Sequence, residues 1–156
     1  MSRRASSWTI GVGLVLLALT GCIGQTVYHH YEHTPVAGWE REDALTFGVP
    51  PMKERAVIRR SVDLRTTAAY PFRSLSLVVD QIVFPSRMHR RDTVHCTLAD
   101  GDGKRLGDGR SMFQQTFPLP DISLNEGDSL SVTIHHVMAR ETLTGIADVG
   151  LRLEAY

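Results

Sequence analysis

Apolar and polar residues alternate with a period of two over much of the chain. Successive side chains of an extended strand point to opposite faces, so this period predicts β-strands rather than amphipathic helices. The clearest alternations run over residues 129–138 and 147–154, and each is typical of a half-buried strand in an antiparallel sheet. The expected inward residues are Leu130, Val132, Ile134, His136 and Met138 in the first, and Ala147, Val149, Leu151 and Leu153 in the second.

Residues 74–84 are apolar on both sides, as expected for a central strand, and Pro85 ends this segment because proline has no N–H for the ladder. Short strands separated by frequent turns predict an all-β fold, an antiparallel β-sandwich that is jelly-roll-like with roughly eight strands. Weaker strands are expected at residues 26–32, 44–48, 56–64, 93–98 and 111–117, and turns at 100–103, 107–109 and 125–128.

The first 21 residues have a different pattern. Arg3 and Arg4 precede an apolar run from Trp8 to Leu19, and together these are the parts of a secretory signal. The run is about a dozen residues long, short of the roughly 20 that a membrane-spanning helix needs. It ends in Leu19-Thr20-Gly21-Cys22, which resembles the lipobox of bacterial lipoproteins. We therefore expect cleavage between Gly21 and Cys22, and lipidation of Cys22.

The alternative for Cys22 is a disulfide with Cys96, as in many exported proteins. The charged start, the apolar run and the small residues directly before Cys22 favour lipidation. Cys96 shares one side of an extended segment with Val94 and Leu98, so we expect it to be a small core residue. Lipidation with two or three acyl chains would make the attachment permanent, because each buried CH₂ contributes about 0.8 kcal/mol.

We expect residues 1–21 to be a cleaved signal peptide, residues 22–26 a lipidated tether and residues 27–156 a single β-sandwich domain. Cleavage leaves 135 of the 156 residues, which is the size of one domain. It also leaves 15 basic residues against 17 acidic ones, and this near-balance argues against nucleic acid as a partner. Several arginines precede residue 92 in separate segments, and we expect them on a solvated face, with a basic patch for lipid head groups or an acidic partner as the alternative. They are Arg59, Arg60, Arg65, Arg73, Arg87, Arg90 and Arg91.

Few residues suggest catalysis or metal binding. Alternate side chains of the histidine-rich segment 29–33 should point to opposite faces, so no compact set of ligands forms. Of His135 and His136, we expect one at the surface and one packed with a hydrogen bond. The loop that starts at Asp100 fails the EF-hand pattern, because its sixth position is Arg105 rather than glycine. Catalytic motifs are absent from the sequence, so we expect no cofactor and no enzymatic activity.

Several motifs are more specific than the strand pattern, and the stretch at 143–150 (LTGIADVG) is the most specific. The others are Trp39, Phe47, Leu64-Arg65, Tyr70-Pro71-Phe72-Arg73-Ser74-Leu75, Asp92-Thr93-Val94, Leu98-Ala99-Asp100, Gly103, Gly107, Gly109, Met138 and Arg140-Glu141. With these motifs the mature chain resembles the gliding-motility lipoprotein GldH family of Bacteroidota across nearly all of residues 22–156. Ser74 and Leu106 stand where relatives tend to have Asn and Trp, which weakens inferences about surface contacts.

The resemblance implies a membrane-anchored, non-enzymatic structural or assembly component. Such a protein works with other gliding motility lipoproteins and with the linked type IX secretion apparatus. Ile23 follows Cys22 where an Asp would signal inner-membrane retention, so we expect an outer-membrane lipoprotein that faces the periplasm. The alternative is an envelope lipoprotein whose sandwich binds a carbohydrate or another small ligand, but Trp39 is the only tryptophan left after cleavage.

Two loops carry structural expectations. Pro71 biases Tyr70 toward an extended conformation at the entry to the central strand. The aromatic rings there are expected either to pack as ordinary core residues or to cap the core. The segment from Arg140 to Asp148 joins the last two strands. Arg140 is expected either to pair with Asp148 or Asp92 inside a structured loop, or to belong to a partner-binding surface.

Overall fold

The computed structural model describes residues 24–156, which form two four-stranded sheets and one two-stranded pair. The predicted signal peptide, its cleavage after Gly21 and the lipidation of Cys22 lie outside the described residues. The strands are β1 (Gln25–His33), β2 (Trp39–Glu40), β3 (Leu45–Val49), β4 (Ala56–Thr67), β5 (Ser74–Phe84), β6 (Met88–Thr97), β7 (Met112–Leu124), β8 (Ser129–His136), β9 (Thr142–Leu143) and β10 (Ile146–Ala155).

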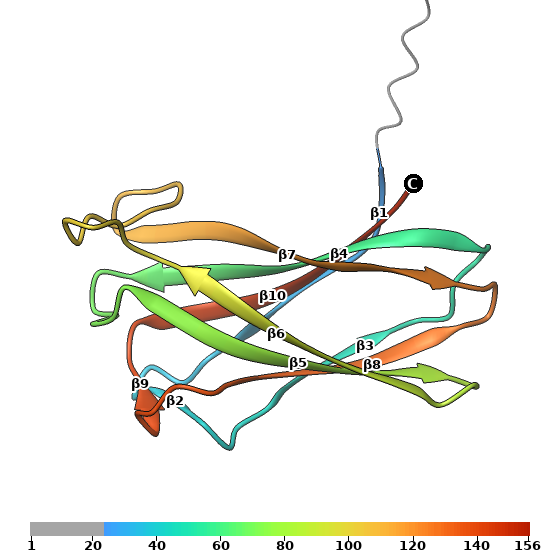
Figure 1. Ribbon diagram of the computed structural model, residues 1–156, viewed down its shortest axis with the longest axis horizontal. Coiled ribbons are helices and arrows are strands. Elements are labelled where there is room, and N and C mark those ends of the chain that lie inside the picture. Colours follow the sequence, from blue (N-terminus) through green and yellow to red (C-terminus); the bar gives the residue numbers. More distant parts are fainter. Residues whose placement is uncertain (1–23) are drawn as a thin grey trace, which may run out of the picture.

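The two large sheets pack face to face as two layers (Figure 1). Sheet I has the strand order β1-β10-β4-β7 and sheet II the order β3-β8-β5-β6, and neighbouring strands are antiparallel. Each sheet alternates strands from the two halves of the chain, which is the jelly-roll arrangement of interlocked Greek keys. The predicted fold class is therefore confirmed. The short strands β2 and β9 add a separate pair at one end of the sandwich.

Strand β8 confirms the predicted alternation, because its even-numbered residues from Leu130 to His136 are buried and the residues between them are half-buried. Strand β10 departs from it in two ways. A bulge between Ile146 and Asp148 places Ile146 rather than Ala147 in the core. Asp148 and Gly150 on the opposite side are also buried, so the outer face of sheet I is covered by other side chains.

Strand β5 lies between β8 and β6, as predicted for a central strand, and ends directly before Pro85. Strand β7 runs past its predicted end and contains Pro118 and Pro120. It is an edge strand, where the missing N–H groups of proline break no ladder, so the strand continues. Strand β1 begins at Gln25, inside the segment predicted to be the tether.

The core between the sheets confirms two predictions about single residues. Cys96 is fully buried, and burial raises the pKa of its thiol to about 12, so it packs as an apolar residue. His136 is also fully buried, and its Nε2 lies 3.1 Å from the carbonyl oxygen of Trp39, whereas His135 is only half-buried. Burial lowers the pKa of His136, which favours the neutral imidazole.

The aromatic rings of the motif before β5 pack into the hydrophobic core. Tyr70 is fully buried and donates a hydrogen bond from its hydroxyl to the carbonyl oxygen of Ser74 over 2.8 Å. Phe72 packs against the core with its ring 5.7 Å from that of Tyr70.

Candidate functional site

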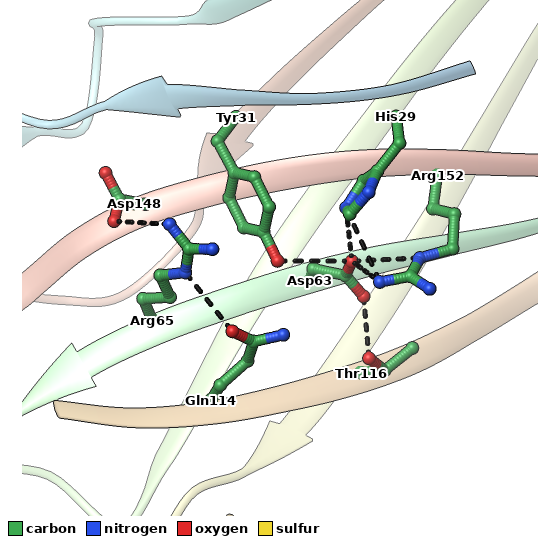
Figure 2. A network of polar contacts seen from close by, with 8 residues as sticks. All are labelled: His29, Tyr31, Asp63, Arg65, Gln114, Thr116, Asp148 and Arg152. Atoms are coloured by element: carbon green, nitrogen blue, oxygen red, sulfur yellow. Dashed lines mark hydrogen bonds and ion pairs between the residues drawn. The ribbon is translucent and has the colours of Figure 1, made fainter. Parts of the chain in front are cut away.

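A network of polar side chains covers the outer face of sheet I (Figure 2). All four strands contribute to it, because the antiparallel register brings their outward positions side by side: Asp63 on β4 stands opposite both Gly150 on β10 and Thr116 on β7. We call this set the Asp63 network. Its members are His29 and Tyr31 from β1, Asp148 and Arg152 from β10, Asp63 and Arg65 from β4, and Gln114 and Thr116 from β7.

Asp63 lies at the centre of the network, and its side chain is fully buried although it points away from the core. Its Oδ1 accepts a hydrogen bond from Thr116 Oγ1 at 2.7 Å, and its Oδ2 lies 2.9 Å from Arg152 Nη2. The same Oδ2 contacts His29 Nε2 at 2.9 Å and the Tyr31 hydroxyl at 3.3 Å. Both oxygens are thus occupied by neighbouring side chains.

The electrostatics of Asp63 follow from these contacts. Burial alone would raise its pKa, since the charged form loses water. The hydrogen bonds from Thr116 and Arg152, the positive charge of Arg152 and the contact with His29 outweigh burial, so the pKa of Asp63 is lowered. The carboxylate therefore stays ionised at neutral pH, and its contacts link β4 to β1, β7 and β10.

Gly150 makes room for the second part of the network. A Cβ at this position would lie 2.8 Å from two ring atoms of Tyr31, so the ring lies closely over the backbone of β10. The guanidinium of Arg65 stacks on the Tyr31 ring, with its Cζ 3.9 Å from the ring centroid. Arg65 also binds Gln114 Oε1 at 3.2 Å and Asp148 Oδ2 at 3.6 Å.

Of the two roles expected for Arg140, the pairing with Asp148 or Asp92 does not occur among residues 24–156. Asp148 pairs with Arg65 and with His33, and Asp92 pairs with Arg60 at 2.8 Å and with Arg90 at 3.1 Å. Both carboxylates therefore already have basic partners other than Arg140. Arg140 is exposed, and it has no ion pair within residues 24–156.

Arg60 is a buried charge that the sequence analysis placed on a solvated face. It is 1% exposed and extends between the sheets, where Nη1 donates to Gln81 Oε1 at 3.0 Å. Its Nε and Nη2 donate to the carbonyl oxygen of Pro120 at 2.9 and 2.7 Å, in addition to the ion pair with Asp92. The alternation of β4 contains the missed signal, because Arg60 occupies the inward position between Ile58 and Val62.

The histidines are divided between the two sides of β1 as predicted. His29 and His33 bind Asp63 and Asp148 on the outer face, whereas His30 lies 3.0 Å from Glu32 on the other side. Within residues 24–156, His, Cys, Asp and Glu side chains form no group of three or more that could hold a metal ion. The described part of the chain also has no helix long and apolar enough to span a membrane.

A second polar region lies at one end of the sandwich. A cavity of about 560 Å³ opens between the loop before β5 and the loop after β8, and we call it the Arg140 cavity. Apart from Ala69, its lining comes from two segments singled out in the sequence, the aromatic motif at 70–75 and the segment that starts at Arg140. These motifs lie far apart in the sequence, and the fold brings them together.

Fold and site together define an all-β jelly-roll domain. Hydrogen bonds and ion pairs join the polar side chains on the outer face of sheet I, and a cavity with polar and apolar walls lies at one end. The chain belongs to the GldH lipoprotein family, whose model matches residues 26–153. Membership makes it a membrane-anchored lipoprotein of the cell envelope, from a family associated with gliding motility. No curated protein sequence matches it.

Solved structures show only distant likenesses. An aminopeptidase from a Thaumarchaeota archaeon is 14% identical with a TM-score of 0.40, and an α-amino acid ester hydrolase is 15% identical with a TM-score of 0.37. The matches cover 74% and 73% of this chain but only 24% of each hydrolase, so this chain spans about a quarter of their length. Eiger TNF from S. frugiperda is 10% identical with a TM-score of 0.33, over 85% of this chain and 94% of that one. Scores this low carry no argument about function.

Proposed function

We propose that this protein is a non-enzymatic assembly component of the gliding motility and type IX secretion-associated envelope machinery. It is anchored through lipid on Cys22 in the outer membrane and faces the periplasm, where it binds other motility lipoproteins and secretion-system proteins. A membrane anchor concentrates such a domain beside its neighbours, so that even modest surface contacts suffice for assembly.

The observation that carries this proposal is the arrangement of charges on the outer face of sheet I. The Asp63 carboxylate is bound on both oxygens, and the Arg65 guanidinium is held by Tyr31, Gln114 and Asp148. Side chains that are fixed in this way form a rigid surface, and binding to a rigid surface loses less conformational entropy than binding to a mobile one. This favours a binding role over a catalytic one.

The position of the anchor supports the same role. Strand β1 begins at Gln25, three residues after Cys22, and three extended residues reach about 10 Å. The domain would therefore be held close to the membrane surface, at the end of sheet I where Gln25 pairs with Ala155.

The test compares the wild-type protein with Cys22→Ala and with Cys96→Ala, which serves as the matched control because Cys96 is a core residue. Intact mass, membrane fractionation and crosslinked pull-down from the native envelope are measured for each. We expect acyl mass, membrane attachment and motility or secretion partners for the wild type and Cys96→Ala, and their loss in Cys22→Ala. A wild-type protein that carries no lipid, fractionates as soluble and brings down no such partners would overturn the proposal.

A further inference from the structure

The Arg140 cavity has two kinds of wall. Ala69, Pro71 and Phe72 form an apolar side, and Arg140, Thr142 and Thr144 form a polar side, with the Glu141 carboxylate beside them. Its volume of about 560 Å³ falls within the range of ligand pockets, roughly 300–1,000 Å³. The cavity can therefore take a charged group and an apolar side chain of one ligand at the same time.

The two loops around the cavity are locked together. Gly145 has a φ of +83°, and a Cβ on it would lie 2.1 Å from the backbone nitrogen of Tyr70, so only glycine permits this approach. The backbone N–H of Thr67 donates to the carbonyl oxygen of Gly145 over 2.8 Å. The pairing of Trp39 with Leu143 holds the second loop from its other side. The cavity is thus preformed, which lowers the entropic cost of binding.

Arg140 differs from the arginines that the fold uses. Arg60, Arg65 and Arg152 are each bound to a carboxylate at 2.8, 3.6 and 2.9 Å. Arg140 lines the cavity, is exposed and has no such partner in the described part of the chain. A guanidinium presents a planar fork of donors that matches a carboxylate in two parallel hydrogen bonds. A carboxylate is therefore a group that Arg140 can bind through both arms of the guanidinium.

The rest of the lining and the position of the cavity narrow the choice of ligand. The exposed Glu141 carboxylate can accept a hydrogen bond beside that carboxylate, and a peptide supplies a donor in its backbone N–H groups, which a simple anion lacks. The cavity adjoins the ends of sheet I where β4 ends at Thr67 and β10 begins at Ile146. The chain enters sheet I at the opposite end, through Gln25. A domain anchored at Cys22 would thus present the cavity away from the membrane, to a protein rather than to lipid.

We propose that the Arg140 cavity binds an extended, carboxylate-bearing peptide segment of a partner protein. The carboxylate, from an acidic side chain or a C-terminus, pairs with Arg140, and a neighbouring apolar side chain packs on Pro71 and Phe72. This inference rests on the proposed function, because it requires that the protein act by binding other envelope proteins.

The test places a photoreactive amino acid at Thr144 of the full-length lipoprotein in its native envelope. The matched control has the same amino acid at Ser131, on the outward side of β8. We expect crosslinking from Thr144 to a protein segment that contains a carboxylate, identified by mass spectrometry. Arg140→Glu should lower this crosslinking at least tenfold, whereas Arg140→Lys should retain part of it, because lysine keeps the charge but loses the fork.

A synthetic peptide with the sequence of the crosslinked segment then tests the chemistry on the purified lipoprotein. Exchange of its carboxylate for an amide should weaken binding by about 10- to 100-fold, which is typical for the loss of a charge-assisted hydrogen bond. Undiminished crosslinking in Arg140→Glu, or peptide binding that ignores the amide exchange, would overturn the inference. If partners are captured from Ser131 but not from Thr144, the inference fails and the proposed function stands. If no envelope protein is captured from either position or by pull-down, both fail.

Discussion

The outer face of sheet I and the loop end of the same sandwich both contain arginines and carboxylates, but they use them differently. In the Asp63 network the carboxylate is fully buried, and its partners come from β1, β7 and β10. In the Arg140 cavity the guanidinium is exposed and unpaired within residues 24–156. A charge that is bound by its own fold stabilises that fold and stiffens the face that contains it, whereas an exposed charge without a partner is available to pair with a charged group of a ligand.

The largest expected effect concerns the buried arginine between the sheets. Arg60→Met should lower the free energy of unfolding by about 3–5 kcal/mol. It leaves the buried Gln81 Oε1 and the Pro120 carbonyl oxygen without their donor, and Asp92 keeps only its second partner, Arg90. Urea unfolding measures the change. The control is Arg59→Met, whose exposed guanidinium only stacks on Tyr156 at 4.8 Å, and it should cost less than about 1 kcal/mol. Equal losses in the two variants would contradict the structural role of Arg60.

The two loops around the Arg140 cavity should be the next most sensitive to substitution. Gly145→Ala should cost about 3 kcal/mol, because a Cβ meets the Tyr70 backbone and the residue must also keep a positive φ. Gly103→Ala is the matched control: its φ is +81°, nearly the same, but no atom lies within 4 Å of the added Cβ. Gly103→Ala should therefore cost only the strain of an alanine at positive φ, about 1–2 kcal/mol. The difference between the two urea midpoints isolates the contact between the loops, and its absence would show that the loops are not locked.

Asp63→Asn should lower the free energy of unfolding somewhat less than Gly145→Ala does, and the size of the loss should depend on pH. We expect a loss of about 2 kcal/mol at neutral pH, since Arg152 is 30% exposed and can regain water when its partner is neutral. The pKa of Asp63 is lowered in the folded state from its ordinary value of 3.8, so its stabilisation is complete well above that pH. The stabilisation is lost as the pH falls through the lowered pKa of the folded state.

The measurement for Asp63 is urea unfolding of the wild type and Asp63→Asn between about pH 7 and pH 2. The two proteins should differ most at neutral pH and converge in acid. A difference that stays constant over this range would mean that the carboxylate charge contributes nothing and that Asp63 acts through shape alone.

The smallest expected effect on stability is that of Arg140→Ala. Because the guanidinium is exposed and unpaired among the described residues, the free energy of unfolding should change by less than about 0.5 kcal/mol. The melting temperature should therefore stay the same while the crosslinked complex is lost. A destabilised variant that still forms the complex would place Arg140 among the structural charges and remove the contrast between the two regions.

The strand pattern of the sequence was sufficient for the fold class, and the motifs were sufficient for the family. The alternation in β8 predicted four buried residues correctly, from Leu130 to His136, because one face of that strand meets the core and the other meets solvent. The prediction for β10 was less accurate, because a bulge shifts its first inward residue to Ile146 and a polar network covers its outer face. The end of β7 was missed because prolines are compatible with an edge strand, and sequence does not reveal which strands lie at an edge.

The sequence by itself determined that the chain forms antiparallel strands, that Cys96 and His136 point inward, and that glycine-rich segments form the turns. These are local properties, since they depend on a period of two residues and on the conformations that single residues allow. Only the tertiary structure decided which charges are paired. Three partners of Asp63 lie 34, 53 and 89 residues away from it along the chain, and the register of the four strands brings them together. Register and sheet order are set by the packing of the whole core. This is why the buried network, and the lack of an ion pair for Arg140 among residues 24–156, emerge only in the folded molecule.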